Sequence, residues 1–261
     1  MRRLGLYLNL CHRFFYDNLA EINIFVQHME YRALQQAEFY DIRDRILYED
    51  NHLLVFNKRS GEIVQGDKTG DECLAETLKA FIARRDAKPG KVFMGIPHRL
   101  DRPVSGICVF AKTSKALERL SQMFREGQVH KTYWALCCAK PDPEQGSLEN
   151  WLTRNEKLNK SFVSKEGAPG AKLARLNYRY LQSTQRYHLV EVELLTGRHH
   201  QIRCQLANIG CCIKGDLKYG APRSNPDGGI SLHARTVQLL HPVRKEPLDI
   251  TSPLPSSWPN L

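Results

Sequence analysis

The sequence predicts an α+β fold, with a mixed and largely antiparallel sheet and flanking helices. Segments with strand-type alternation are interspersed with segments of helical periodicity, without the regular βαβα rhythm of a parallel sheet. The glycine patterns G-x-G-x-x-G and G-x-x-x-x-G-K-[ST] are both missing, so a dinucleotide site or a P-loop is unsupported. The 261 residues are 42% hydrophobic and 25% charged, which excludes a disordered or fibrous chain.

The first half of the compact region contains strands and helices that follow each other closely. In chain order we expect strands at 46–48 and 53–56, a helix with its apolar face over 74–82, strands at 92–96 and 107–111, a helix over 117–124, and a strand at 129–138. Asp71 is expected to cap the first helix, and Thr113 or Ser114 the second. A polar loop from 98 to 105 separates the third and fourth strands.

The second half is less regular. We expect a polar excursion over 141–174 with one or two short strands, a strand at 187–195, a helix that starts near Arg198 and carries Ile202, Leu206 and Ile209, a strand at 232–240, and an irregular tail. Residues 1–44 are expected to be an N-terminal extension of low information, because charged residues interrupt their apolar stretch. No apolar run approaches the roughly 20 residues that a membrane span requires.

The charge balance favours a polyanionic partner. Lys and Arg number 38 against 28 Asp and Glu, a formal net charge of +10. Nucleic acid and an anionic membrane face both fit such an excess, and a basic protein without either partner also remains open.

The cysteines predict no zinc site. None forms a C-x-x-C pair, and two sets are directly adjacent, which does not suit the spaced ligands of zinc. We expect small buried thiols in a reducing, cytoplasmic compartment. The eight are Cys11, Cys73, Cys108, Cys137, Cys138, Cys204, Cys211 and Cys212.

The string HRLDRPVSG is the most informative stretch. Asp101 lies between Arg99 and Arg102, and it is the only acidic residue from 91 to 117. Neighbouring cations favour the ionised carboxylate, which can act as a nucleophile or a general base. The alternative is a loop aspartate that accepts backbone hydrogen bonds or pairs with Arg102.

Two further strings contain candidate functional residues, one at an expected helix start and one in an expected strand. In LLTGRHHQIR, Arg198 is a cation at an expected helix start, where acidic residues are preferred, so it could grip a carboxylate or phosphate. A solvated surface arginine is the alternative. A metal site at His199 and His200 is disfavoured, because no nearby ligand has suitable spacing.

In VHKTYWA, Tyr133 could stack on a nucleobase, or be a half-buried strand tyrosine.

Taken together and in this order, HRLDRPVSG, KTYWA and LLTGRHHQIR resemble the motifs of the RluA-like RNA pseudouridine synthases, from about residue 45 to 253. The resemblance implies the catalytic fold of that family, with a central active-site cleft, over residues 45–261. Many members carry an N-terminal S4 RNA-binding domain, whose pattern residues 1–44 do not show.

The resemblance also implies roles for single residues. Asp101 is the expected catalytic aspartate, and Tyr133 is expected to stack on the target uracil. Arg198 is expected to form an ion pair with Asp101, Arg99 to enter the RNA stack, and Ile202 to line the base pocket. Val104 and His199 depart from the threonine or serine that the family often has, where we expect altered geometry and retained activity.

The expected function is isomerisation of a uridine in structured RNA, ribosomal or transfer, to pseudouridine. The sequence leaves open whether Asp101 attacks C1′, adds to C6 or deprotonates C2′. No cofactor, metal or membrane is expected, and a monomer is the expected state. One alternative is a catalytically silent RNA-binding or ribosome-assembly protein of the same fold. A metal-dependent nuclease is disfavoured, since such sites require clustered carboxylates.

Overall fold

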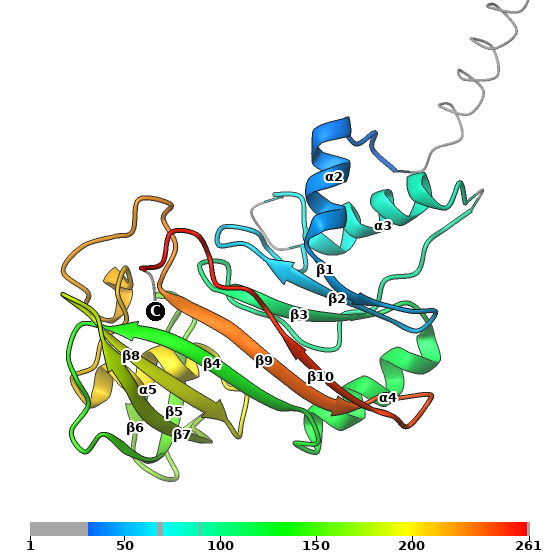
Figure 1. The fold of residues 1–261 in the computed structure, drawn as a ribbon. Helices are drawn as coiled ribbons and strands as arrows, with labels where there is room; N and C mark the ends of the chain where they lie inside the picture. Colours follow the sequence, from blue (N-terminus) through cyan, green and yellow to red (C-terminus); the bar gives the residue numbers. More distant parts are fainter. Residues whose placement is uncertain (1–30, 67–69, 89, 260–261) are drawn as a thin grey trace, which may run out of the picture.

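One ten-stranded sheet runs through the described residues, 31–66, 70–88 and 90–259, of the computed structural model (Figure 1). In chain order the elements are α2 (Gln36–Asp44), β1 (Ile46–Glu49), β2 (Leu53–Lys58), α3 (Leu74–Arg85), β3 (Ser105–Ala111), α4 (Ser114–Arg125), β4 (His130–Cys137), β5 (Gln145–Asn155), β6 (Lys160–Ser164), β7 (Lys172–Ser183), β8 (His188–Leu194), α5 (Gln201–Asn208), the 3-10 turn η1 (Leu217–Tyr219), β9 (Leu232–Leu240) and β10 (Pro247–Thr251).

The strand order is β1-β2-β3-β9-β4-β8-β7-β5-β6, with β10 paired to β9. Among these strands only β3 and β9 pair in parallel, through Ser105–His233 and Gly106–Ala234. The other pairs are antiparallel. The predicted α+β class with a mixed, largely antiparallel sheet is therefore confirmed.

Helices cover the two ends of this sheet, and the central strands lie between them (Figure 1). The helices α2, α3 and α4 lie beside β1, β2 and β3, whereas α5 lies against β5 and β6 at the opposite end. All seven residues of β3 are buried, as are five of the six in β2, so these strands form the core of the first end. A smaller apolar cluster under α5 consists of Leu152, Ala174, Cys204 and Tyr219.

Several predicted elements are present close to their expected positions. The strands at 46–49, 53–58, 105–111, 130–137, 188–194 and 232–240 all form. Thr113 caps α4, because its side chain accepts a hydrogen bond from the Ala116 amide at 3.2 Å. These segments have strong apolar alternation or runs of buried residues, the patterns from which a strand is most readily predicted.

Other predictions are wrong. The excursion over 141–174 contains the two strands β5 and β6, as expected, but β5 is not short: it has 11 residues and pairs with β7 in the main sheet. The apolar run at 92–96 forms no strand; only Gly95 makes an isolated bridge, to Ala111. The cap of α3 is Cys73 and not Asp71, whose carboxylate pairs with Arg102 at 2.7 Å. The tail contains β10.

The predicted domain boundary after residue 44 falls between α2 and β1, inside one packed unit. Ile42 of α2 is 1% exposed and belongs to the main core cluster, and the ring of Phe39 packs on Phe81 of α3 with centroids 4.8 Å apart. The predicted extension over residues 1–30 lies outside the described residues. Within the part of the chain that the structure describes, no helix is long and apolar enough to cross a membrane.

Candidate active site

The loop that carries Asp101 is held by a lysine from a neighbouring strand. Lys58, the last residue of β2, is fully buried, and its ammonium donates to the carbonyl oxygens of Asp101 at 3.3 Å, Arg102 at 3.0 Å and Val104 at 2.6 Å. Leu100 and Val104 are buried on either side of Asp101. The backbone of the loop is therefore fixed from inside, while the carboxylate of Asp101 remains about one-third exposed.

Gly106 makes the approach of β3 to β9 possible. Its φ is 107°, and a Cβ built on it would collide with the backbone oxygen of Ala234. Any other residue would be strained and would push the two strands apart. Because β3 starts only four residues after Asp101, this close parallel contact sets where the loop leaves the sheet.

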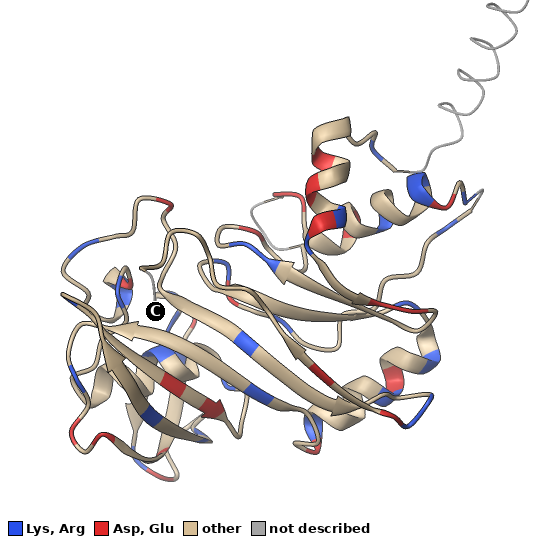
Figure 2. Cartoon of the chain, viewed as in Figure 1, with Lys and Arg blue, Asp and Glu red and all other residues tan. Residues whose placement is uncertain are grey.

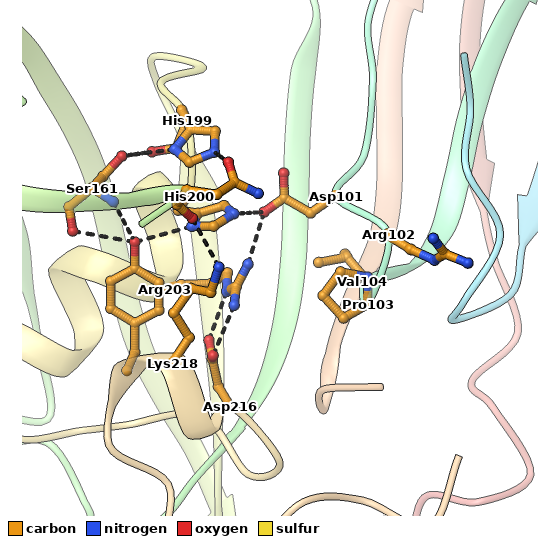
Figure 3. Close-up of polar contacts among 12 residues, drawn as sticks. Asp101, Arg102, Pro103, Val104, Ser161, His199, His200, Arg203, Asp216 and Lys218 are labelled. Atoms are coloured by element: carbon orange, nitrogen blue, oxygen red, sulfur yellow. Dashed lines mark hydrogen bonds and ion pairs between the residues drawn. The ribbon is translucent and has the colours of Figure 1, made fainter. Parts of the chain in front are cut away.

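The carboxylate of Asp101 shares a buried arginine with a second carboxylate (Figure 3). Arg203, on the first turn of α5, donates through Nη1 to Oδ2 of Asp101 at 3.3 Å. It also binds Asp216 through Nε at 2.6 Å and Nη2 at 2.8 Å. Burial opposes the charge, but the hydrogen bonds and charge of Asp216, with the charge of Asp101, raise the pKa of Arg203.

Arg203 is shared unequally between the two carboxylates. Two carboxylates face one guanidinium, and Asp216 takes both of the shorter bonds. The side-chain contacts of Asp101 with Arg203 and His200 both involve Oδ2. Asp101 is therefore oriented by a cation and remains available to react.

His200 is the second neighbour of Asp101. Its Nε2 lies 3.6 Å from Oδ2 of Asp101, and its Nδ1 lies 3.1 Å from the hydroxyl of Tyr219 (Figure 3). That hydroxyl also accepts a hydrogen bond from the Ser161 amide at 2.8 Å. Burial, and then the charge of Arg203, lower the pKa of His200 to about 2, so the imidazole is neutral.

The backbone at His200 lies in the left-handed region, with φ of 51°. This is uncommon for a residue other than glycine, and it occurs immediately before α5. Gln201 closes the preceding turn: its side-chain oxygen accepts from the Arg198 amide at 3.0 Å, and its Nε2 donates to the Arg175 carbonyl at 2.9 Å. Helix α5 therefore begins at Gln201, three residues later than predicted.

Tyr133 forms the opposite wall of the site. It lies on β4, in register with Val192 of β8 and Ala234 of β9, and is only 6% exposed. Burial, followed by the nearby Cys108 and Asp101, raises the pKa of its phenol, so Tyr133 keeps its proton. Tyr133 therefore presents a protonated ring, fixed in the middle of the sheet, to the cavity that Asp101 also lines.

All five predicted site residues line a single cavity of about 100 Å³. The cavity also contains Arg203, His200 and Gln201, and it lies next to a larger groove of about 810 Å³ that shares Asp101, Tyr133, Arg99 and Arg198. The five are Arg99, Asp101, Tyr133, Arg198 and Ile202. Residues from three distant parts of the chain thus meet at one place.

One predicted role is wrong. The ion pair with Asp101 is made by Arg203, whereas Arg198 is exposed and donates through Nε to the Leu173 carbonyl at 2.8 Å. The reason is the late start of α5: Arg198 lies in the preceding turn, and the first turn of the helix brings Arg203 inward. Arg198 still lines the cavity, so its role as a substrate-binding residue stays a prediction.

Sequence reasoning missed Lys58, His200, Arg203 and Asp216 as site residues. His200 and Arg203 both lie inside the quoted string LLTGRHHQIR, so the motif contained the signal for them. Lys58 and Asp216 are single charged residues without a motif, and only their burial at 0% and 1% reveals their function in the site.

Charged side chains are distributed over both ends of the molecule, with Lys and Arg also on the central strands β4 and β9 (Figure 2). In the groove beside Asp101 the cations predominate: Arg99, Arg125, Lys131, Arg154 and Arg198 against Asp101 and Glu193. Within the described residues, no group of three or more His, Cys, Asp or Glu could hold a metal ion. The predicted absence of metal and cofactor stays a prediction.

Comparison with known proteins identifies the family. The model of the RNA pseudouridylate synthase family matches residues 52–208, a span that contains Asp101, Tyr133 and Arg203. The chain belongs to this family. The ribosomal large subunit pseudouridine synthase C of Vibrio cholerae is 35% identical over 215 residues, which cover 80% of this chain and 65% of that protein. The mitochondrial pseudouridylate synthase RPUSD4 of Xenopus tropicalis is 33% identical, covering 84% of this chain and 79% of that one.

A solved member of the RNA pseudouridylate synthase family has the same fold. The human RNA pseudouridylate synthase domain containing 4 superposes with a TM-score of 0.70 at 26% identity, over 84% of this chain and 91% of that chain. The predicted pseudouridine synthase fold is therefore confirmed. The family match and the relatives also indicate an isomerase that modifies RNA.

Proposed function

We propose that this protein converts uridine in RNA to pseudouridine, with Asp101 as its catalytic residue. The observation that carries the proposal is the carboxylate of Asp101, held by Arg203 in the cavity that contains Tyr133. In this reaction the N1–C1′ bond breaks, the uracil turns, and a C5–C1′ bond forms. C5 loses a proton and N1 gains one, so substrate and product are isomers and no oxidant or group acceptor is needed.

The target base must leave its stack before Asp101 can reach it. Extrusion costs a few kcal/mol, and stacking on Tyr133 would return about 1–3 kcal/mol. Ile202 would contact the extruded base in the same cavity. Arg99, which is exposed at the cavity, would enter the space in the RNA that the base has left.

Asp101 can then attack C1′, add to C6 or deprotonate C2′. In each case the carboxylate must be correctly aimed, and Arg203 would hold it in position. A preorganised cation matters, because small errors in the position of a reacting group reduce the rate greatly. No observation favours a catalytically silent RNA-binding or ribosome-assembly role, since carboxylate, guanidinium and tyrosine are all present in the site.

We further propose ribosomal RNA over transfer RNA as the substrate. The support is the name of the Vibrio cholerae relative, a ribosomal large subunit pseudouridine synthase. A cytoplasmic location and a monomeric state also belong to this proposal, on the sequence grounds given above. Mapping pseudouridines in total RNA with and without the protein identifies the modified molecule and position.

The direct test is release of tritium from RNA that carries 5-tritiated uridine. Asp101→Asn is expected to lower the rate by about a thousandfold or more, because the nucleophile or base is removed. The matched control is Asp44→Asn, an exposed aspartate at the end of α2, which should release tritium as the wild type does. Comparable rates in both variants would contradict the role of Asp101. Release that survives excess chelator would support a metal-free reaction.

A further inference from the structure

Four cysteines gather where the end of β4 meets the segment that follows α5. Cys137 forms an isolated antiparallel bridge with Ile213. The amide of Cys138 donates to the carbonyl of Cys212 at 2.8 Å, and the amide of Lys214 donates to the carbonyl of Leu136 at the same distance. This register places Cys138 directly opposite Cys212.

The opposing pair differs in accessibility from its neighbours. Cys137 and Cys211 are buried, at 0% and 1% exposure, whereas Cys138 and Cys212 are both partly exposed. Side chains alternate along extended chain, so Cys138 and Cys212 share one side of this two-stranded segment. A dissolved reagent can therefore reach Cys138 and Cys212 and cannot readily reach Cys137 or Cys211.

Cys138 faces Cys212 across this pairing, and its thiol is hard to ionise. Burial, and then a hydrogen bond with Cys212, raise the pKa of Cys138 to about 12. Cys138 thus keeps its proton, so the first attack is assigned to Cys212. All seven cysteines in the described part of the chain are free thiols.

The backbone spacing suits a cross-link. Directly opposite residues that exchange a backbone hydrogen bond in an antiparallel pair have Cα atoms about 5.5 Å apart. Disulfides span Cα distances of about 4.4–6.8 Å. The Cα spacing expected for Cys138 and Cys212 therefore lies within the range of a disulfide.

We propose that Cys138 and Cys212 form a reversible dithiol–disulfide site that reacts with small disulfides of the glutathione type. The thiolate of Cys212 attacks one sulfur of glutathione disulfide and releases one glutathione. Cys138 then loses its proton and attacks the Cys212 sulfur of the mixed disulfide, which releases the second glutathione. Two electrons pass from the protein to the reagent, and the two protons leave on the released thiols.

The position of the cross-link determines what it changes. It closes a loop from 138 to 212 that contains β5 to β8 and α5. A bond across so long a loop removes freedom mainly from the unfolded chain. Because the folded backbone is already paired here, the oxidised protein should unfold at a higher temperature and keep the activity of the reduced one. This inference does not depend on the proposed function.

The test treats the reduced full-length protein with glutathione disulfide near neutral pH, then measures the intact mass and the unfolding temperature. The expected product has lost two hydrogen atoms, carries no glutathione, unfolds at a higher temperature, and reverts with dithiothreitol. Cys138→Ser and Cys212→Ser should each lose this product. Cys138→Ser should accumulate a mixed disulfide at Cys212.

Adjacent cysteines fall in the same proteolytic peptide, so peptide mapping alone does not show which of them forms the disulfide. Matched control variants are therefore needed to assign the bond. Cys137→Ala and Cys211→Ala should both retain the cross-link and the rise in unfolding temperature. Stable glutathionylation without a cross-link would overturn the proposal, as would loss of the cross-link in Cys137→Ala or Cys211→Ala. A cross-link that forms only in urea would also overturn it, since the proposal requires the folded register.

Discussion

At the scale of single residues, one guanidinium holds both the exposed carboxylate of Asp101 and the buried carboxylate of Asp216. Arg203 binds Asp216 with two short bonds and Asp101 with one longer bond. The stability of α5 against the rest of the domain and the aim of the catalytic carboxylate therefore depend on the same side chain. Arg198, in the same motif but on the exposed turn, has no such double task.

Substituting Arg203 and Arg198 separates these tasks. Arg203→Met leaves Asp216, which is 1% exposed, as a buried unpaired charge, so the free energy of unfolding should fall by about 3–5 kcal/mol. Arg203→Lys keeps the charge and loses the bidentate geometry, so tritium release should fall by about a hundredfold or more. Arg198→Met should change the free energy of unfolding by no more than about 0.5 kcal/mol. Urea unfolding measures the free energies of unfolding of the two methionine variants, and Arg203→Met should be the less stable. Equal stability of Arg203→Met and Arg198→Met would contradict the structural task assigned to Arg203.

A second residue-scale prediction concerns His233, which is fully buried and hydrogen bonds through Nδ1 to Ser105 at 2.9 Å. Burial, and then Arg235, lower its pKa from 6.5 to about 4. Between these values the unfolded chain binds a proton and the folded protein does not, so acidification favours unfolding. His233 should therefore contribute a loss of up to about 1.4 kcal/mol per pH unit below pH 6.5.

The measurement is urea unfolding at several pH values between 6.5 and 4. His233→Asn keeps a side chain able to hydrogen bond Ser105 but has no imidazole, so its free energy of unfolding should fall less steeply with acid than that of the wild type. His130→Asn, at an exposed histidine, is the control and should follow the wild type. A His233→Asn profile parallel to the wild type would show that His233 does not titrate in this way.

At the scale of elements, strand β2 reaches into the catalytic loop through its last residue. Lys58→Met would leave several carbonyl oxygens of residues 101–104 without their buried donor. An unsatisfied buried acceptor costs about 1–3 kcal/mol, so the free energy of unfolding should fall by at least that amount. Tritium release per folded molecule should fall as well, because the loop is no longer fixed. Full activity in a folded Lys58→Met protein would show that β2 does not position Asp101.

The elements differ in how far their sequence determines them. Strands β3, β8 and β9 could be predicted because one or both faces are buried, which requires apolar residues at regular spacing. In β5, eight of 11 residues have polar or glycine side chains and only Leu152 is buried, so the alternation that marks a strand is absent. Its pairing with β7 is set by the partner strand, which a local pattern does not contain.

The same distinction applies to the site. Asp101, Tyr133 and the string around Arg203 could be found because they lie in motifs. Which of the two arginines points inward depends on the left-handed backbone of His200 and the turn closed by Gln201, and both are tertiary features. Lys58 and Asp216 could not be predicted as site residues from their neighbours in the sequence, because the assembled fold decides whether a charged side chain is buried.

At the scale of the whole molecule, cations line two cavities that meet at Asp101. The groove of about 810 Å³ and a pocket of about 360 Å³ are both lined by Arg99, Asp101 and Arg154. Arg125 and Lys131 add charge in the groove, and Lys218 in the pocket. A phosphate backbone could therefore contact positive side chains before and after the nucleotide that enters the cavity.

This arrangement predicts that the affinity for RNA falls steeply as the salt concentration rises. Arginines that take no part in the reaction at Asp101 should contribute to this dependence. Each lost phosphate contact should reduce the slope of log affinity against log salt by about 0.7–0.9. Arg125→Gln and Arg154→Gln should each produce this reduction. The matched control is Arg43→Gln, an exposed arginine on α2 that neither the groove nor the pocket contains. Filter binding of RNA between low and moderate salt measures the slopes. If the slope of log affinity against log salt fell equally in all three variants, the effect would come from net charge alone. The proposed RNA contacts in the groove and pocket at Asp101 would then be wrong.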